Sequence, residues 1–190
     1  SPLVGDERMR QPRTRAGLIE LPALVAQGKV TPQGVQQQLF GNRNLMAQMV
    51  LPDLLASCPT APTPAARDGC VALQSWDRRN NVESRGAHLF REFWRQARGI
   101  PGVYALAFDP ANPIATPSGL KMADAAVAGK VWEALAAAVG KVRDAGFALD
   151  APWGDVQRPA ITELPIALHG GDGNEGVLNY LSASGAPDLN

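Results

Sequence analysis

The sequence predicts a mostly helical fold with a small β element at its C-terminal end, which is the α+β class. Apolar residues recur at helical spacing in several runs between residues 31 and 145, whereas strand-like alternation is confined to the end of the chain. The few strands visible are too few for an independent sheet. We therefore expect a helical region with a disulfide-closed loop over residues 1–150. A strand and glycine-rich-loop region over residues 151–190 should lead into further chain.

The first helix is expected to begin at Pro32. Thr31 suits the N-cap, and proline suits the first helical position because its missing N–H would be unpaired there anyway. Val35, Leu39 and Phe40 follow at helical spacing, with glutamines on the other face. A second helical run covers residues 42–55.

Two features complicate the chain after this point. Pro52 is expected to kink or restart the second helix, because proline lacks a donor for the helical hydrogen bond. After a loop bounded by cysteines, Leu73 and Trp76 predict a short helix that ends near residue 77.

The clearest amphipathic helix is SRGAHLFREFWRQAR, with Ser84 as its expected cap and with Gly99 and Pro101 ending it. The predicted core face comprises Ala87, Phe90, Phe93, Trp94 and Ala97, and the predicted solvent face comprises Arg91, Glu92, Arg95 and Gln96. The proline-rich stretch FDPANPIATPSGL is then expected to be an ordered loop. The longest helix should span residues 122–145, with an apolar stripe of Val127, Val131, Trp132, Leu135 and Val139, and Gly146 should end it.

The last forty residues differ in character. APWGDVQRP is a turn-rich connector, ITELPIALHGG predicts one short strand, and VLNYL predicts a second. Between them lies the glycine-rich loop GGDGNEG. This loop lacks the lysine and hydroxyl residue of a P-loop, so a phosphate-binding role is disfavoured.

Composition excludes some classes of partner. Lys plus Arg number 18 and Asp plus Glu number 18, so the net charge is zero and neither nucleic acid nor an anionic membrane is expected to bind. No run approaches the length of a membrane span. The basic cluster RMRQPRTR is interpreted as solvated or locally paired charge.

Cys58 and Cys70 bound the segment CPTAPTPAARDGC, which has the composition of a loop. A disulfide between them is the favoured interpretation and would indicate an oxidising compartment. The alternative is a pair of buried, reduced thiols. No histidine or third cysteine lies close enough in sequence to complete a zinc site.

The candidate catalytic and metal-binding residues are few. His88 and Glu92 are spaced four apart, but a surface polar pair is favoured over a metal site. For His169, a ring hydrogen-bonded to loop backbone is favoured over a general base or a metal ligand. Ser1 could act as an N-terminal nucleophile with its own amine as base, but Pro2 and the polar residues that follow do not suit a buried strand. No metal or cofactor is expected.

Seven segments carry a family likeness over almost the whole chain. In order they are SPLVGDER followed by RTR, LFGNRNLMAQMVLPDLLASC, CVALQSWD, SRGAHLFREFW, FDPANPIATPSGL, ALDAPWGDVQ and LPIALHGGDGNEGVLN. Together they resemble an internal part of the β chain of penicillin-acylase-type amidohydrolases, especially the acyl-homoserine-lactone acylase and aculeacin acylase branch. The resemblance implies a larger αββα N-terminal-nucleophile hydrolase, processed into α and β chains and located in the periplasm or secreted.

The resemblance also implies where the reaction centre lies. The nucleophilic serine and the oxyanion asparagine of the family are expected upstream of this segment, so no catalytic residue is expected within it. Arg8, in GDER, matches an arginine that supports the oxyanion asparagine, a task suited to the rigid donor fork of a guanidinium. The implied partners are the α chain, the rest of the β chain and a small N-acyl substrate. The rival hypothesis is a stand-alone helical module that binds a partner or an apolar ligand.

Overall fold

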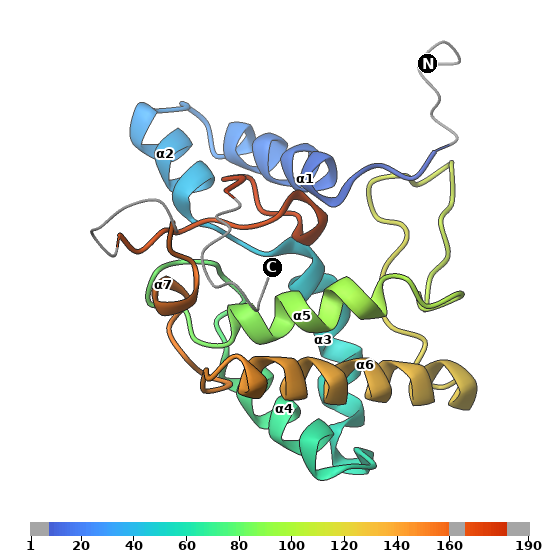
Figure 1. Cartoon of the computed structure of the whole chain (residues 1–190). Helices are drawn as coiled ribbons and strands as arrows, with labels where there is room; N and C mark the ends of the chain where they lie inside the picture. The colour runs from blue at the N-terminus through green and yellow to red at the C-terminus, as the bar shows by residue number, and fades with distance from the viewer. Residues whose placement is uncertain (1–7, 160–165, 182–190) are drawn as a thin grey trace.

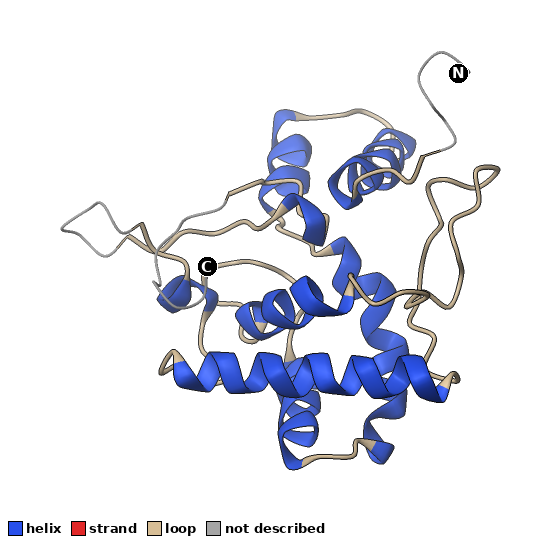
Figure 2. Ribbon diagram, turned by 45° about the vertical axis from the view of Figure 1, so that its right-hand side comes forward, coloured by secondary structure: helices blue, strands red, loops and turns tan. Residues whose placement is uncertain are grey.

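The computed structural model describes residues 8–159 and 166–181, and this part of the chain is built mainly of helices (Figures 1 and 2). They are α1 (Pro12–Ala26), α2 (Pro32–Phe40), α3 (Leu45–Ser57), the 3₁₀ turn η1 (Cys58–Thr60), α4 (Pro64–Ser75), α5 (Ala87–Ala97), α6 (Ala125–Asp144), α7 (Trp153–Val156) and the 3₁₀ turn η2 (Gly173–Glu175). The mostly helical class is confirmed.

The β content of the described residues is limited to isolated bridges, so the two predicted strands do not form a ladder there. Residues 161–165 of the first predicted strand lie outside the described residues. The second contributes only the parallel bridge between Gly171 and Tyr180. A strand is stable only when a neighbour accepts its backbone hydrogen bonds, and the described chain supplies no such neighbour at this point.

The core forms where α5 and α6 pack against each other and α6 packs against α4, with α3 alongside (Figure 1). Its largest members are aromatic: Trp76, Phe90, Phe93, Trp94, Trp132 and Trp153. Gly69 marks the closest approach of α4 to α6. A Cβ atom there would lie 2.9 Å from Leu135 Cδ1, so a larger residue would force the two helices apart.

α5 is buried almost all round, which differs from its predicted amphipathic character. The five predicted core residues are buried, as expected, but Arg91 and Glu92 are buried as well. Each of these two has an oppositely charged partner from another element, which makes its burial tolerable. Ser84 does not cap the helix, because Gly86 at φ +110° is the N-cap. The Ser84 hydroxyl instead donates to Asp77.

α6 agrees with the prediction. Asp124 accepts from the N–H groups of Ala126 and Val127 and so caps the helix. The predicted apolar stripe is buried along its whole length. Gly146 follows the helix at φ +81°, a left-handed conformation that glycine adopts without strain.

α1 was not predicted, and one residue of the basic cluster, Arg15, departs from the predicted solvated or locally paired state. Arg15 is buried, with Nε 2.8 Å from the Ile114 carbonyl oxygen and Nη1 2.8 Å from that of Pro117. It is therefore paired to a distant loop rather than solvated or paired locally. These two hydrogen bonds join α1 to the loop around residues 108–120.

α2 begins at Pro32 as predicted, whereas α3 begins at Leu45, three residues after the predicted start. The Thr31 hydroxyl accepts from the Gly34 N–H, 3.1 Å away, and Asn44 caps α3. Pro52 does not interrupt α3, which continues through it to Ser57. Packing holds the helix on both sides of the proline, because Val50, Leu51 and Leu54 are buried in the core while Pro52 itself is exposed.

The predicted disulfide is present, joining Cys58 and Cys70 with their Cα atoms 6.0 Å apart. The segment between them is a loop only in its first part. Thr63 caps α4, which starts at Pro64, so Cys70 lies on a helix rather than in a loop. The disulfide therefore staples the end of α3 to α4.

Candidate functional site

Arg8 is the residue to which the resemblance assigns a supporting role. It lies at the edge of the described chain, where it is exposed. Ser1 lies outside the described residues, as do the residues just before Arg8 in GDER. The geometry of the described chain therefore does not bear on the Ser1 hypothesis, and the role of Arg8 stays a prediction.

His88 and Glu92 do not form the expected surface pair. His88 is buried, with Nε2 2.8 Å from the Ala148 carbonyl oxygen, and burial lowers the pKa of its imidazole. The Glu92 carboxylate is also buried and binds Lys141 Nζ at 2.6 Å and Arg95 Nη1 at 2.8 Å. Both side chains are thus committed to holding α5 against its neighbours.

His169 contacts side chains instead of the predicted loop backbone. Its Nδ1 lies 2.9 Å from Asn42 Nδ2 and 3.3 Å from Asn179 Nδ2. Amide nitrogens only donate, so Nδ1 accepts and the ring proton sits on Nε2 in the neutral form. The ring also packs near Phe40, with centroids 5.5 Å apart. His169 therefore joins α2 to the C-terminal segment.

An asparagine-rich seam that the sequence did not reveal lies beneath His169. The Asn42 side chain donates to Asn81 Oδ1 at 2.7 Å, and Asn44 Nδ2 donates to Asn80 Oδ1 at 3.1 Å. The Gly170 N–H donates to the Asn80 carbonyl oxygen at 2.8 Å. Asn42 has φ +48°, a region that asparagine enters more readily than most residues. The Gly41-Asn42 pair was the one sequence signal that could have indicated this left-handed turn.

The loop GGDGNEG contains a turn that is closed by its own acidic side chains. Asp172 Oδ1 accepts from the Asn174 N–H at 2.7 Å, and Glu175 Oε2 accepts from the Asp172 N–H at 2.8 Å, which together form a capping box around η2. These N–H groups are already used within the turn. The N–H groups of Asp172 and Asn174 therefore stabilise the turn itself.

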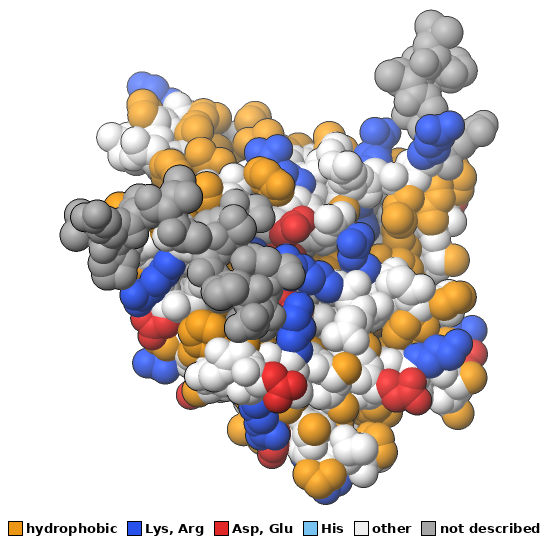
Figure 3. Space-filling model, viewed as in Figure 1, with side chains coloured by type: hydrophobic (Ala, Val, Ile, Leu, Met, Phe, Trp, Pro, Cys, Tyr) orange, Lys and Arg blue, Asp and Glu red, His pale blue; other side chains and the backbone are white. Residues whose placement is uncertain are grey.

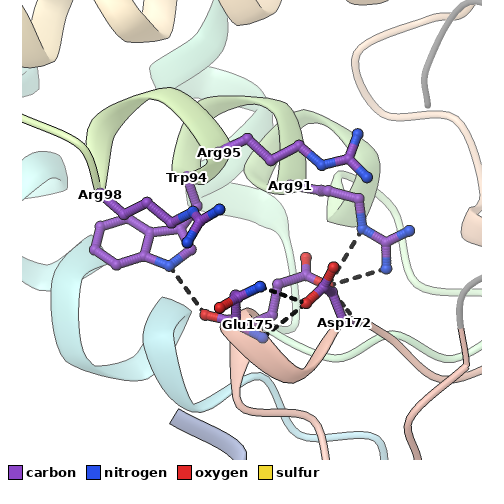
Figure 4. A pocket seen from close by; sticks show the side chains of 7 residues that line it. Arg91, Trp94, Arg95, Arg98, Asp172 and Glu175 are labelled. Atoms are coloured by element: carbon purple, nitrogen blue, oxygen red, sulfur yellow. Dashed lines mark hydrogen bonds and ion pairs between the residues drawn. The ribbon is translucent and has the colours of Figure 1, made fainter. Parts of the chain in front are cut away.

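Glu175 joins this turn to α5. Its Oε2 also binds Arg91 Nη2 at 2.9 Å, and both side chains are buried. Arg91 lies over Trp153, with its guanidinium carbon 4.3 Å from the ring centroid. Trp94 Nε1 donates to the Asn174 carbonyl oxygen (Figure 4). A small pocket opens here, lined by Arg91, Trp94, Arg95, Arg98, Asp172, Asn174 and Glu175. It holds about 40 Å³, far less than the roughly 300 Å³ of a small ligand site.

The described residues show no assembled reaction centre. Neither histidine there is hydrogen-bonded to a serine or cysteine side chain, and the two cysteines are joined to each other. In residues 8–159 and 166–181 no cluster of three or more metal-ligating side chains occurs. Nor does any helix in those residues combine the length and apolar character required to cross a bilayer. The polar contacts described above hold elements together.

Comparison with known proteins gives a consistent match. The sequence profile of penicillin amidases matches residues 4–187. The chain is 34% identical to acyl-homoserine lactone acylase PvdQ of Pseudomonas savastanoi pv. phaseolicola, over 99% of this chain and 25% of that protein. It is 35% identical to the protein of the same name from Pseudomonas syringae pv. tomato, over the same shares.

Another relative is aculeacin-A acylase of Actinoplanes utahensis, which is 32% identical over 95% of this chain and 24% of that protein. The chain thus spans about a quarter of the length of these curated relatives. Because the family profile covers nearly every residue, the chain belongs to the penicillin amidase family.

Proposed function

We propose that this chain is a scaffold and pocket-wall segment of an N-acyl amidohydrolase, which hydrolyses the amide bond between an acyl chain and an amine. The observation that carries the proposal is the family match over residues 4–187. The names of the relatives point to N-acyl-homoserine lactones and lipopeptides as substrates, and penicillins follow from the name of the family.

In the proposed reaction, a serine at the start of the parent's β chain attacks the amide carbonyl and its own amine accepts the proton. That proton then passes to the leaving amine as the C–N bond breaks, which leaves the acyl chain as an ester on the serine. An asparagine side chain and a backbone N–H stabilise the oxyanion, and water then releases the acid. These groups lie in the parent outside this chain. Arg8 is the residue of this chain proposed to act closest to them, by orienting the oxyanion asparagine.

The core aromatics are proposed to support the pocket from behind. Trp76, Phe90, Phe93 and Trp94 are all at most 4% exposed, so nearly all of their surface is used in core packing. Their packing fixes α5, and a rigid α5 would in turn hold any pocket wall that rests on it. The Cys58–Cys70 disulfide is consistent with a periplasmic or secreted parent, since such bonds persist in oxidising compartments.

The test is made on the full-length parent, with release of amine from an N-acyl-homoserine lactone, a lipopeptide or penicillin G as the assay. Arg8→Ala should lower kcat about 10- to 100-fold with little change in KM, because the oxyanion donor would be misplaced while substrate binding is kept. Arg8→Lys should not restore kcat, since an ammonium lacks the planar donor fork.

Arg98→Ala is the matched control, because Arg98 is also an exposed arginine and lies at the C-terminal end of α5. Absence of amine release by the wild-type parent would reject the amidohydrolase. A kcat of the Arg8→Ala parent equal to that of the Arg98→Ala parent would reject the supporting role alone. The stand-alone module is disfavoured by the exposed apolar residues on α1 and α2, which a monomeric domain rarely leaves uncovered.

A further inference from the structure

α1 is oriented with its apolar side outward. Ala16 and Glu20 are buried, and Glu20 binds Arg43 at 2.8 Å. On the opposite side of the helix, by the 100° rotation per residue, lie Leu18, Leu21 and Val25, which are 39%, 51% and 61% exposed. The inward side of the helix is therefore held by Ala16 and by the Glu20–Arg43 ion pair, while Leu18, Leu21 and Val25 face solvent.

α2 continues this exposed surface. No residue of α2 is buried, and Val35 and Leu39, one turn apart, are 45% and 37% exposed. Gly34 packs against Leu24, so α2 lies directly beside α1. Hydrophobic side chains gather over both helices in the space-filling view (Figure 3). We name the set Leu18, Leu21, Val25, Val35 and Leu39 the α1–α2 face.

The composition around this face matches a protein interface. Between residues 21 and 40 the only charged residue is Lys29, and the polar side chains are mostly glutamines. Depletion of charge is the compositional mark of an interface core. A helix that lies on a membrane surface would instead carry several lysines or arginines along its polar side.

We infer that the α1–α2 face docks against the part of the parent acylase that lies outside this chain, through an apolar, uncharged surface. This inference rests on the proposed function. The curated relatives are about four times as long as this chain, so most of the parent's surface is available to cover these helices. Covering five large apolar side chains would remove the exposure that α1 and α2 show here.

The first experiment uses thiol labelling of the full-length parent. Val35→Cys introduces a thiol on the α1–α2 face, while both native cysteines of this chain are held in the disulfide. The labelling rate in the native protein is compared with the rate in guanidinium under non-reducing conditions. Docking predicts a native rate at least tenfold slower than the denatured rate, and any smaller protection overturns the inference.

The second experiment places a charge on the same face. Val35→Glu should lower the yield of the assembled parent and its Tm by several degrees. Gln37→Glu is the matched control, because Gln37 is exposed and lies on the opposite side of α2, and its Tm should stay near wild type. Equal effects of the two variants would overturn the inference. So would a wild-type dimer that Val35→Glu converts to a stable monomer, since a second copy would then cover the face.

The two proposals fail separately. A parent that protects Val35→Cys but releases no amine from acylated substrates keeps the docking surface and loses the proposed function. A parent that hydrolyses those substrates while Val35→Cys labels freely keeps the function and loses the docking surface.

Discussion

Arg91 and Glu175 form a buried ion pair, 84 residues apart in the sequence and 2.9 Å apart in the structure. The guanidinium also lies over the Trp153 ring, and the carboxylate also accepts from the Asp172 N–H. A buried charge is tolerated when its partner and hydrogen bonds are in place, and removal of one partner leaves the other charge uncompensated. This pair therefore links α5 to the η2 turn.

Glu175→Gln should lower the free energy of unfolding by about 3 kcal/mol, because Arg91 would keep its charge in a buried site without a counter-ion. Urea unfolding measures the change. Asp155→Asn is the control, since the Asp155–Arg158 pair is largely exposed and its loss should cost at most about 1 kcal/mol. Similar losses of unfolding free energy for both variants would contradict the larger contribution expected from the buried Arg91–Glu175 pair.

His88 makes stability depend on pH. Burial lowers the pKa of its imidazole, and the hydrogen bond to the Ala148 carbonyl offsets this only in part. The unfolded chain therefore binds more protons than the folded chain below the usual histidine pKa of about 6.5. Stability from this residue is complete above that pH and is lost as the pH falls toward the lower folded pKa.

The pH effect is checked by urea unfolding between about pH 5 and pH 8. His88→Gln keeps a donor for the Ala148 carbonyl and removes the titration, so its free energy of unfolding should fall less steeply below about pH 6.5 than that of the wild type. His169 is present in both proteins and cancels in the comparison. Parallel pH profiles would contradict the assignment to His88.

At the scale of elements, close packing between helices decides at which glycines a larger side chain would destabilise the fold. Gly69 on α4 faces α6, where a Cβ atom would lie 2.9 Å from Leu135 Cδ1 and 3.1 Å from Val139 Cγ2. Gly140 on α6 has no such neighbour within 4 Å of a Cβ position. Both glycines are helical, so their intrinsic helix propensities are the same and only the contacts differ.

Gly69→Ala should lower the free energy of unfolding by about 1–3 kcal/mol, because the added methyl group overpacks the α4–α6 contact. Gly140→Ala should raise it by about 0.5–1 kcal/mol, because alanine favours the helix and meets open space. Thermal unfolding of the two variants shows whether each substitution lowers or raises stability. A stabilising Gly69→Ala would show that α4 and α6 separate without cost.

At the scale of the whole molecule, the Cys58–Cys70 disulfide stabilises the fold because it restricts the conformations of the unfolded chain. Cys58 and Cys70 close a loop of twelve residues, which by the chain-entropy estimate contributes roughly 3 kcal/mol. Reduction should therefore lower the Tm, and titration of the unreduced chain in denaturant should find no free thiol among its two cysteines. A Cys58→Ser/Cys70→Ser variant should show the lower Tm with and without reductant. An unchanged Tm on reduction of the wild type would contradict the constraint.

The sequence by itself determined the features that depend on near neighbours. The Thr31 cap, the stripe of α6, the apolar side of α5 and the paired cysteines were all predicted, because caps, helical spacing and short loops depend on residues close together in the chain. The family was also recognisable from seven ordered segments.

The tertiary structure alone decided the rest. Arg91 and Glu92 carry charge and were predicted to face solvent, yet they are buried because their partners Glu175 and Lys141 come from distant positions. α1 went unpredicted because its apolar residues do not face the core of this chain and its inward side is held by Arg15 and Glu20. A sequence pattern reports the preference of each side chain, whereas burial is set by the residues that fold around it.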